Sequence, residues 1–590
     1  MLTNKEIAEI LTNIAEYLAM EDIPFKPRAY EKVAESVLAL DEEISGLYKR
    51  GGRAAILTIP GVGASIADHV EELIKTGKLA YYEQLKLETP VDLATLTKVE
   101  GLGPKKIKRL YEKLKIKNLD DLEKAAKAGT IGVLEGFGKK SEENILKGIE
   151  FVRASGGRML LGNIVPEVRS IEERLRKVKA VEHFAVAGSI RRRKETVGDI
   201  DILVVAKNAE TVMDAFTAMP EVARVYAKGP TKSMVRLKAG IDADLRVVPP
   251  ESYGAALNYF TGSKDHNVHL RKIAISKGMK LNEYGLYKKT NNKKLTTNDN
   301  EWKLVAGKTE EEIYSALGLE YIPPEMREDA GEVELAEEKK LPKLIDYGDL
   351  KGDLQTQTNW TDGADSIRAM ADAAMKAGLE YIVITDHTKR LAMTGGLDEK
   401  KILEQIEEIR KINGDLQKEK KKFRILAGSE CDILKDGSLD ISDDVLAKLD
   451  VVGISVHSYF NLPIEEQTAR VVKAMHNPHA DILFHPTGRR IGKRPAYPID
   501  MEEIIAVAKK TGTILEIDAF PDRLDLKDDH IRKCVKAGVK MSIDSDAHSV
   551  SHFSVLEFGI SQARRGWVTK GGIINTYPVD QMLKLLKNRA

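Results

Sequence analysis

The sequence predicts a multidomain protein with a helical N-terminal part, an α+β middle part and a C-terminal distorted (β/α) barrel. Its 590 residues are enough for about four domains. A Gly-apolar-Gly turn recurs three times in the first 150 residues, where strand signals are scarce. Helices and short strands alternate from 160 to 250, and from about 346 short apolar runs end repeatedly in acidic or imidazole side chains.

The composition describes a globular protein without an overall charge bias. There are 92 Lys and Arg residues against 91 Asp and Glu residues, so any surface for nucleic acid must be local. The two cysteines fit a reducing compartment. Because the sequence shows neither a signal peptide nor an apolar run long enough to span a bilayer, we expect a cytoplasmic protein without a membrane partner.

The helical N-terminal part contains the repeated turn at 59–63, 99–103 and 134–138. Glycine permits a tight turn between helices, and the amides at the start of the next helix can bind phosphate. The pattern resembles the helix-hairpin-helix motif, which binds the DNA backbone irrespective of sequence. The second copy continues into a basic helix, so we expect salt-dependent affinity for DNA. The residues concerned are Gly61, Gly63, Gly101, Gly103, Lys105, Lys106, Gly136 and Gly138.

The middle part contains the stretch GSIRRRKETVGDID at 188–201. Asp199 and Asp201 alternate in a predicted strand, so their carboxylates share one face and can hold a divalent cation such as Mg²⁺. The preceding Gly188-Ser189 turn and the arginines after it can bind phosphate. This combination predicts phosphoryl or nucleotidyl transfer with a triphosphate substrate. Asp242 and Asp244 both offer a third carboxylate; Asp244 leads into an apolar run, although the local sequence does not decide between them.

A further signature follows at 259–262, where the sequence reads Tyr-Phe-Thr-Gly. With the three hairpins and the GSxRR…GDxD pattern, it resembles a family X DNA polymerase over roughly 1–325. The GSxRR…GDxD pattern alone is shared with other nucleotidyltransferases. The resemblance implies helix-hairpin-helix domains at 1–80 and 81–155 (the second forming the fingers), a nucleotidyltransferase palm at 156–255 and a thumb at 256–325. We interpret the charged residues 326–345 as a linker.

The resemblance also implies roles for particular residues of the palm and thumb. A carboxylate triad would bind two Mg²⁺ ions, with Mn²⁺ as an alternative, and other residues would bind the triphosphate, the incoming sugar and the minor groove of the nascent pair. The triad is Asp199, Asp201 and Asp244; the triphosphate residues are Gly188, Ser189, Arg192 and Gly198; the sugar residues are Tyr259, Phe260 and Gly262; the groove residues are Asn267 and Arg271.

The first N-terminal segment departs from the lyase-active members of this family. In those members a lysine forms a Schiff base with the abasic sugar, whereas this sequence has His69 at that place. Imidazole cannot form the iminium that a primary amine forms. Lys26, Tyr30 and Lys32 keep the basic and aromatic character around it. We therefore expect DNA 5′-phosphate binding without deoxyribose-phosphate lyase activity.

The C-terminal part at 346–590 places acidic and imidazole groups after successive apolar runs, as in the active site of a TIM-like barrel. It resembles the PHP (polymerase and histidinol phosphatase) domain, a metal-dependent phosphoesterase. The resemblance implies one metal site of Glu430, His457 and His485, and a second of Asp362, His387 and His548. A third site would use Glu430 and Asp546 with an opening His-x-His motif, for which this sequence has Gln355 and Gln357.

Because an amide oxygen is a weak ligand for Mn²⁺ or Zn²⁺, we expect fewer than three ions and a reduced 3′-5′ exonuclease activity. The sequence as a whole predicts a DNA-directed DNA polymerase that fills short gaps during base excision repair. It would use gapped or primed DNA and dNTPs, in the nucleoid region of the cytoplasm and without an obligate protein partner. The alternatives are a template-independent nucleotidyltransferase, a PHP-type 3′-end nuclease or AP endonuclease with the polymerase half as a DNA clamp, and a non-catalytic scaffold.

Overall fold

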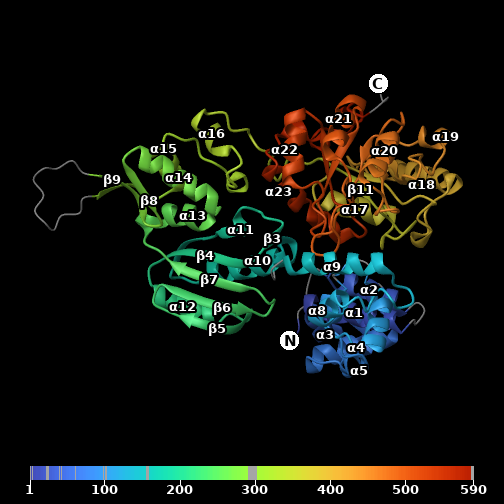
Figure 1. Cartoon of the computed structure of the whole chain (residues 1–590), viewed down its shortest axis with the longest axis horizontal. Coiled ribbons are helices and arrows are strands. Elements are labelled where there is room, and N and C mark those ends of the chain that lie inside the picture. Colours follow the sequence, from blue (N-terminus) through green and yellow to red (C-terminus); the bar gives the residue numbers. More distant parts are fainter. Residues whose placement is uncertain are drawn as a thin grey trace, which may run out of the picture. The chain divides into compact units, whose positions relative to one another are not determined.

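The computed structural model describes residues 2–586 except 3, 22–25, 39, 41–42, 60, 98, 100–101, 155–157 and 290–301 (Figure 1). The chain forms two compact units, one of Met1–Gly156 with Arg490–Pro495 and one of Gly157–Arg489 with Ala496–Ala590. Gly101, a predicted DNA contact, lies outside the described residues. Within these described ranges, no helix has both the length and the apolar character needed to cross a membrane.

The first unit is helical over its described residues, as predicted. In its first helix, Ile7, Leu11, Ile14 and Leu18 follow helical spacing and are fully buried. These side chains form part of one core that continues into the later helices of the unit. The helices are α1 (Asn4–Met20), α2 (Lys26–Leu38), α3 (Ile44–Ile56), α4 (Ala64–Thr76), α5 (Ala80–Glu88), α6 (Leu93–Leu96), α7 (Pro104–Leu114), α8 (Leu119–Lys127) and α9 (Lys139–Ala154).

The second unit begins with a five-stranded sheet in the order β2-β4-β7-β6-β5. The β4 and β7 strands are parallel, and the other neighbours in this sheet are antiparallel. Figure 1 shows this sheet with α10 and α12 beside it. The elements are β1 (Met159–Leu160), α10 (Leu161–Lys177), β2 (Val181–Val186), α11 (Gly188–Arg191), β3 (Thr196–Val197), β4 (Asp199–Ala206), α12 (Ala209–Thr217), β5 (Val222–Lys228), β6 (Lys232–Leu237) and β7 (Asp242–Val247).

The next segment combines helices with a small antiparallel sheet in the order β10-β9-β8. Its buried core includes Leu270, Leu286, Ile313 and Tyr314. The elements are α13 (Tyr253–Thr261), α14 (Lys264–Ser276), β8 (Met279–Asn282), β9 (Gly285–Lys289), β10 (Trp302–Ala306), α15 (Glu310–Ala316) and the 3₁₀ helix η2 (Pro324–Met326).

Residues 326–345 differ from the linker expected there. They contain α16 (Glu332–Glu337), whose Val333 and Ala336 pack into the same core as α14 and α15. Glu332 is fully buried and accepts hydrogen bonds from the backbone N–H groups of Asp329 and Ala330. The sequence showed no apolar stripe because two small side chains are enough to anchor so short a helix.

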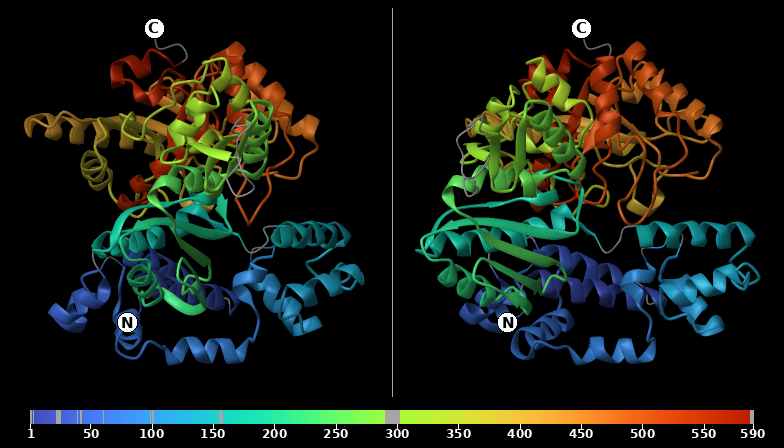
Figure 2. Two further views of the ribbon diagram at one scale, coloured as in Figure 1. Left: turned by 90° about the vertical axis from the view of Figure 1, so that its left-hand side faces the viewer. Right: turned by 60° about the vertical axis from the view of Figure 1, so that its left-hand side comes forward.

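The remainder of the second unit is the predicted barrel, in which seven parallel strands lie in sequence order. The backbone N–H of Gln357 donates to the carbonyl of Ala547, which links the ends of the first and last strands and nearly closes the barrel. The helices of this yellow-to-red segment lie on its outside in Figure 2. The strands are β11 (Gly352–Thr356), β12 (Tyr381–Ile384), β13 (Arg424–Asp432), β14 (Val451–Ser455), β15 (Ile482–Leu483), β16 (Ile514–Asp518) and β17 (Met541–Asp544).

One apolar layer fills the inside of the barrel, and a second lies between strands and helices. The carboxyl ends of the strands therefore present their side chains at one face of the barrel. The main helices are α17 (Ile367–Lys376), α18 (Glu399–Lys418), α19 (Asp443–Leu446), α20 (Ile464–Met475), α21 (Met501–Thr511), α22 (Asp528–Ala537), α23 (Leu556–Arg565) and α24 (Val579–Leu583).

Candidate active sites

The register between β4 and β7 brings three aspartates together. Asp201 lies directly opposite Asp244, and Asp199 lies opposite Asp242. Asp242 and Asp244 each pair with a basic side chain, and the carboxylate of Asp242 is the more exposed of the two. Burial raises the pKa of Asp201 to about 6, and Asp199 and Asp244 add to this effect by charge repulsion. Such a group of carboxylates fits a divalent cation, which would offset their repulsion.

The turn before β4 is built around Gly188. Its φ of +63° is a left-handed conformation that favours glycine. A Cβ at this position would lie 2.6 Å from Oδ2 of Asp201, so a side chain here would collide with the carboxylate. The neighbouring Ser189 has a buried Oγ without a hydrogen-bond partner among the described residues. This hydroxyl can therefore serve an oxygen-rich ligand such as a triphosphate.

Arg192 connects this turn to the end of α13. Its Nη1 donates to the carbonyl of Thr261, and a Cβ at Gly262 would lie 3.1 Å from the same nitrogen. Gly262 also has a φ of +70°. Glycine is therefore favoured there by the left-handed backbone and by the close approach of Arg192. Gly198, just before Asp199, has a similar function, since its Cβ would lie 3.1 Å from Nη1 of Arg158. The glycines thus permit two arginines to approach the backbone beside the aspartates.

The predicted sugar-binding element lies at the end of α13. Tyr259 is 40% exposed and packs edge-on against Phe260, with ring centroids 5.2 Å apart. Asn267 on α14 donates from Nδ2 to the carbonyl of Tyr259 at 2.7 Å, while its buried Oδ1 has no partner in the described part of the chain. Arg271 lies one helical turn further along α14. An exposed ring beside an amide oxygen available for bonding suits contact with a nucleotide.

A buried ion-pair cluster, which the sequence reasoning missed, holds α15 to the glycine turn. Glu310 accepts hydrogen bonds from Arg191 at 2.6 Å and from the fully buried Arg327 at 2.5 Å. Burial by itself raises the pKa of Glu310, but Arg327 and Arg191 outweigh it and lower the pKa to about 2. Glu310 lies 119 residues from Arg191, and no local pattern marks their contact.

The glycine turns of the first unit precede helices as predicted. Gly63 and Gly103 are the N-cap residues of α4 and α7, and Gly138 directly precedes α9. Gly61 and Gly136 have φ values of +81° and +82°. Among the residues that the structure describes, no heavy atom lies within 4 Å of a Cβ built at any of the three residues that precede these helices. The helix N-termini are therefore accessible to a DNA phosphate.

Charge and aromatic groups surround these turns. In α7, Nζ of Lys106 lies 5.7 Å from the ring centre of Phe137 in the third turn, and Lys105 is its neighbour. Around the first turn, the side chain of Lys32 would lie 3.4 Å from a Cβ at Gly61, and Lys26 is exposed at the start of α2. Lys106 thus connects the helix after the second turn to the third turn.

His69 lies between two aromatic rings. Its centroid is 6.0 Å from Tyr30 and 5.0 Å from Tyr81, and its Nδ1 is 2.7 Å from the hydroxyl of Tyr30. Burial lowers the pKa of His69. A neutral, stacked imidazole fits a packing role rather than Schiff-base chemistry, which needs a primary amine.

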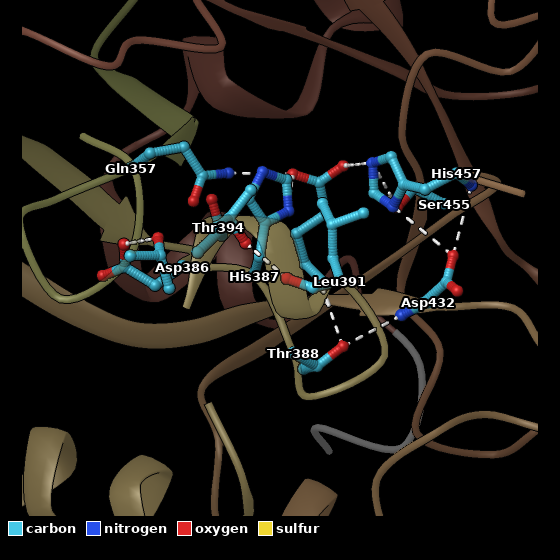
Figure 3. Close-up of polar contacts among 12 residues, drawn as sticks. Gln357, Asp386, His387, Thr388, Leu391, Thr394, Asp432, Ser455 and His457 are labelled. Atoms are coloured by element: carbon cyan, nitrogen blue, oxygen red, sulfur yellow. Dashed lines mark hydrogen bonds and ion pairs between the residues drawn. The ribbon is translucent and has the colours of Figure 1, made fainter. Parts of the chain in front are cut away.

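Glu430, at the end of β13, is the centre of the barrel site. Its Oε1 is 2.8 Å from Nε2 of His485 and 3.0 Å from Nε2 of His457, and its Oε2 is 3.3 Å from Nδ1 of His387. His387 and His457 point toward the same centre (Figure 3). Burial raises the pKa of Glu430, but His387 and His457 outweigh it and hold the pKa well below its usual range. The three residues close enough to share one metal ion are His387, Glu430 and His457, whereas the predicted site had His485 in place of His387.

A second group of possible ligands consists of Asp362, His387 and His548. The carboxylate of Asp362 lies 3.7 Å from Nε2 of His387 and 3.8 Å from Nε2 of His548. The other oxygen of Asp362 is buried without a partner among the described residues. Imidazoles and an unpartnered carboxylate oxygen at these separations fit a Mn²⁺ or Zn²⁺ ion.

The two glutamines occupy the place of the opening His-x-His motif at the end of β11. Nε2 of Gln357 donates to Oε2 of Glu430 at 2.8 Å, so an amide N–H faces the carboxylate that a third ion would bind (Figure 3). Gln355 is fully buried, and neither of its side-chain polar atoms has a partner in the described chain. Both amide oxygens are buried without a partner among the described residues, and an amide oxygen is a weaker ligand for Mn²⁺ or Zn²⁺ than an imidazole nitrogen.

Asp546 borders the second of the two three-residue groups without being one of its three ligands. Its Oδ2 is 3.3 Å from Nη2 of Arg523, which also contacts Asp518, and its Oδ1 is 3.8 Å from Nδ1 of His548. The sequence reasoning missed Arg523 and also missed Asp432, whose Oδ1 lies 3.4 Å from Nδ1 of His457. Asp432 follows Glu430 by two residues on β13, so strand alternation could have identified it.

Comparisons with known proteins divide the chain in the same way. The family model described as DNA polymerase beta thumb matches residues 256–328. Models of a helix-hairpin-helix domain and of a SAM-like helix-hairpin-helix tandem match 2–79 and 93–150. These matches and the nearly closed barrel confirm the predicted fold class.

Three relatives extend the comparison. Over 586 residues the chain is 37% identical to the DNA polymerase/3′-5′ exonuclease PolX of Bacillus subtilis (strain 168), covering 99% of each protein. Its C-terminal part is 30% identical over 234 residues to a probable phosphatase of Thermoanaerobacter sp. (strain X514), covering 38% of this chain and 89% of that protein. DNA polymerase lambda of Arabidopsis thaliana is 25% identical over 301 residues, which are 46% of this chain and 53% of that protein.

Proposed function

Because the chain belongs to the PolX family, in which a family X DNA polymerase is joined to a PHP domain, we propose that its polymerase half fills short gaps in DNA. The observation that carries this proposal is the register that sets Asp201 opposite Asp244 beside Gly188. The helix-hairpin-helix domains at 2–79 and 93–150 favour a DNA substrate over an RNA-tailing nucleotidyltransferase.

In the reaction, the primer 3′-oxygen forms a bond to the α-phosphorus of a dNTP and the bond to pyrophosphate breaks. Asp199, Asp201 and Asp244 would hold two Mg²⁺ ions, or Mn²⁺ in their place. Those ions supply charge stabilisation for the attacking and leaving oxygens when bound. The proton of the 3′-hydroxyl leaves toward the carboxylates or solvent. We assign binding of the triphosphate to Ser189 and Arg192, whose N–H and O–H groups suit phosphate oxygens.

The thumb residues would then select the sugar and the base pair. Tyr259 and Phe260 offer a ring surface on which a deoxyribose can pack, and a ribose 2′-hydroxyl would collide with it. Asn267 presents near the same point an oxygen that has no partner among the described residues, and Arg271 extends along α14 toward the minor groove. The three glycine turns bind the DNA backbone without reading its sequence. A DNA substrate implies residence near the nucleoid.

We also propose that the barrel hydrolyses DNA 3′ ends at a reduced rate. Two groups of three ligands, which share His387, support Mn²⁺ or Zn²⁺ binding, and Gln355 and Gln357 weaken the third site. Metal analysis of the purified protein should give fewer than three ions per chain, and three would refute this assignment. A weakened third metal site also counts against the alternative in which the protein is mainly a 3′-end nuclease or AP endonuclease.

The polymerase proposal is tested by extension of a primer on gapped DNA. The wild type is compared with Asp199→Ala and Asp201→Ala, in Mg²⁺ and in Mn²⁺, with dNTP and rNTP. We expect incorporation of dNTP by the wild type and its loss in both variants, because each removes a ligand that bears charge in the transition state. Incorporation that survives both substitutions would refute the proposed active site.

A further inference from the structure

The turn that follows the predicted phosphate-binding segment is held by the barrel. Arg565, at the end of α23, is 3% exposed. Its Nη1 donates to the backbone carbonyl of Arg192 at 2.8 Å and to Oε1 of Glu328 at 3.1 Å. Its Nη2 donates to Asp528 of the barrel at 2.5 Å. A buried side chain of the C-terminal domain thus contacts the polymerase half at the residue assigned to the triphosphate.

Glu328 connects the same two arginines through their side chains. Its Oε1 accepts from Nε of Arg192 at 3.0 Å as well as from Arg565. Burial raises the pKa of Glu328, but Arg565, Arg192 and Lys194 outweigh it and lower the pKa. Glu328 is therefore ionised at neutral pH, and its hydrogen bonds are charge-assisted.

These contacts fix the orientation of the Arg192 guanidinium. Its Nε is held by Glu328 and its Nη1 by the carbonyl of Thr261. Its Nη2 makes no hydrogen bond to any residue that the structure describes. A planar guanidinium with two nitrogens fixed presents the third in one direction, so it binds a phosphate without a further loss of side-chain freedom.

Other residues of the barrel hold the rest of this turn. Glu195 pairs with Arg489 at 2.8 Å, and Arg193 lies 3.9 Å from Glu557 on α23. The turn is therefore held at Arg192, Arg193 and Glu195, and these contacts limit its movement relative to α23.

We propose that Glu328 and Arg565 are positioning residues for nucleotide binding, through which helix α23 of the C-terminal barrel orients Arg192 toward the triphosphate of the incoming dNTP. The proposal rests on the role of Arg192 given above. It assigns the barrel a part in polymerisation that is independent of its own metal sites.

The test uses single-turnover extension of gapped DNA by the full chain, which separates dNTP affinity from the rate of incorporation. Arg565→Gln and Glu328→Gln should each weaken dNTP affinity about tenfold, because each removes a charge-assisted bond that orients Arg192. The rate at saturating dNTP should change less than threefold. The double variant should be no weaker than the worse single variant, since both act through one side chain.

Arg564→Ala is the matched control. This neighbour on α23 also joins the barrel to the polymerase half, with Nε 2.7 Å from Glu325, but its hydrogen bonds and ion pairs with described residues do not include Arg192. If the substitutions only loosened the contact between the barrel and the polymerase half, Arg564→Ala would weaken dNTP affinity as much as Arg565→Gln does. If Arg565 acts by positioning Arg192, Arg564→Ala should keep the wild-type dNTP affinity. Thermal unfolding and DNA affinity are measured on every variant. If Arg565→Gln fails to fold, the less buried Glu328→Gln carries the same test.

The possible results separate the two proposals. Unchanged dNTP affinity in Arg565→Gln and Glu328→Gln, with loss of activity in Asp199→Ala, overturns the positioning role alone. Equal losses in Arg564→Ala and Arg565→Gln overturn it as well. If Arg192→Ala keeps wild-type dNTP affinity, the triphosphate role of Arg192 fails, and the positioning role fails with it.

Discussion

Replacement of Gly188 by alanine tests how closely the turn and the aspartates depend on each other. The added Cβ would lie 2.6 Å from Oδ2 of Asp201, whereas ordinary contacts begin near 3.5 Å. The carboxylate must therefore move by about 0.9 Å. A misplacement of about 1 Å in a catalytic constellation costs about 10²-fold in rate. The positive φ of +63° adds about 1–2 kcal/mol of backbone strain to the folded state.

Gly240→Ala is the control for this variant. Gly240 also has a positive φ, +82°, but no heavy atom of the described residues lies within 4 Å of its Cβ position. Both variants should lose about 1–2 kcal/mol of stability in denaturant unfolding. Only Gly188→Ala should lose about 10²-fold in the single-turnover rate on gapped DNA. A Gly188→Ala protein with the wild-type rate, or a Gly240→Ala protein with the same loss, would refute the reasoning.

Three further predictions concern the barrel, the thumb and the DNA interface. Gln355→His/Gln357→His should raise the metal content and the 3′-5′ exonuclease rate, because imidazole nitrogens replace amides, as measured by metal analysis and end-labelled DNA. Glu310→Gln should lower the free energy of unfolding by about 3 kcal/mol, since it leaves a buried guanidinium uncompensated. Lys105→Ala/Lys106→Ala should reduce the slope of log DNA affinity against log salt by about 0.9 per lost phosphate contact, in titrations at several salt concentrations.

Each of these predictions has its own control. Gln355→His/Gln357→His should keep the wild-type rate of primer extension. An unchanged metal content in this variant would contradict the assignment of the two glutamines to the place of metal ligands. Glu338→Gln removes a surface pair with Lys340 and should change stability by less than about 1 kcal/mol; a loss as large as that of Glu310→Gln would count against the buried cluster. Lys127→Ala removes an exposed lysine paired with Glu123 on α8 and should leave the salt slope unchanged.

The sequence alone identified the features whose chemistry is local. Alternation placed Asp199 and Asp201 on one face of a strand, and the structure confirms that strand. The glycine turns predicted helix starts at Ala64, Pro104 and Lys139, where α4, α7 and α9 begin. These features depend on the backbone conformation of a few neighbouring residues, so the local sequence is enough to predict them.

The tertiary structure decided the features that depend on residues far apart in the chain. The parallel register of β4 and β7 set Asp244, not Asp242, opposite Asp201. The segment 326–345, expected to be a linker, contains α16 because Val333 and Ala336 pack into the thumb core. Arg565 reaches Arg192 across 373 residues of sequence. Such contacts form only when elements far apart in the chain pack together. No short-range pattern in a single sequence indicates which distant residue will be the contact partner.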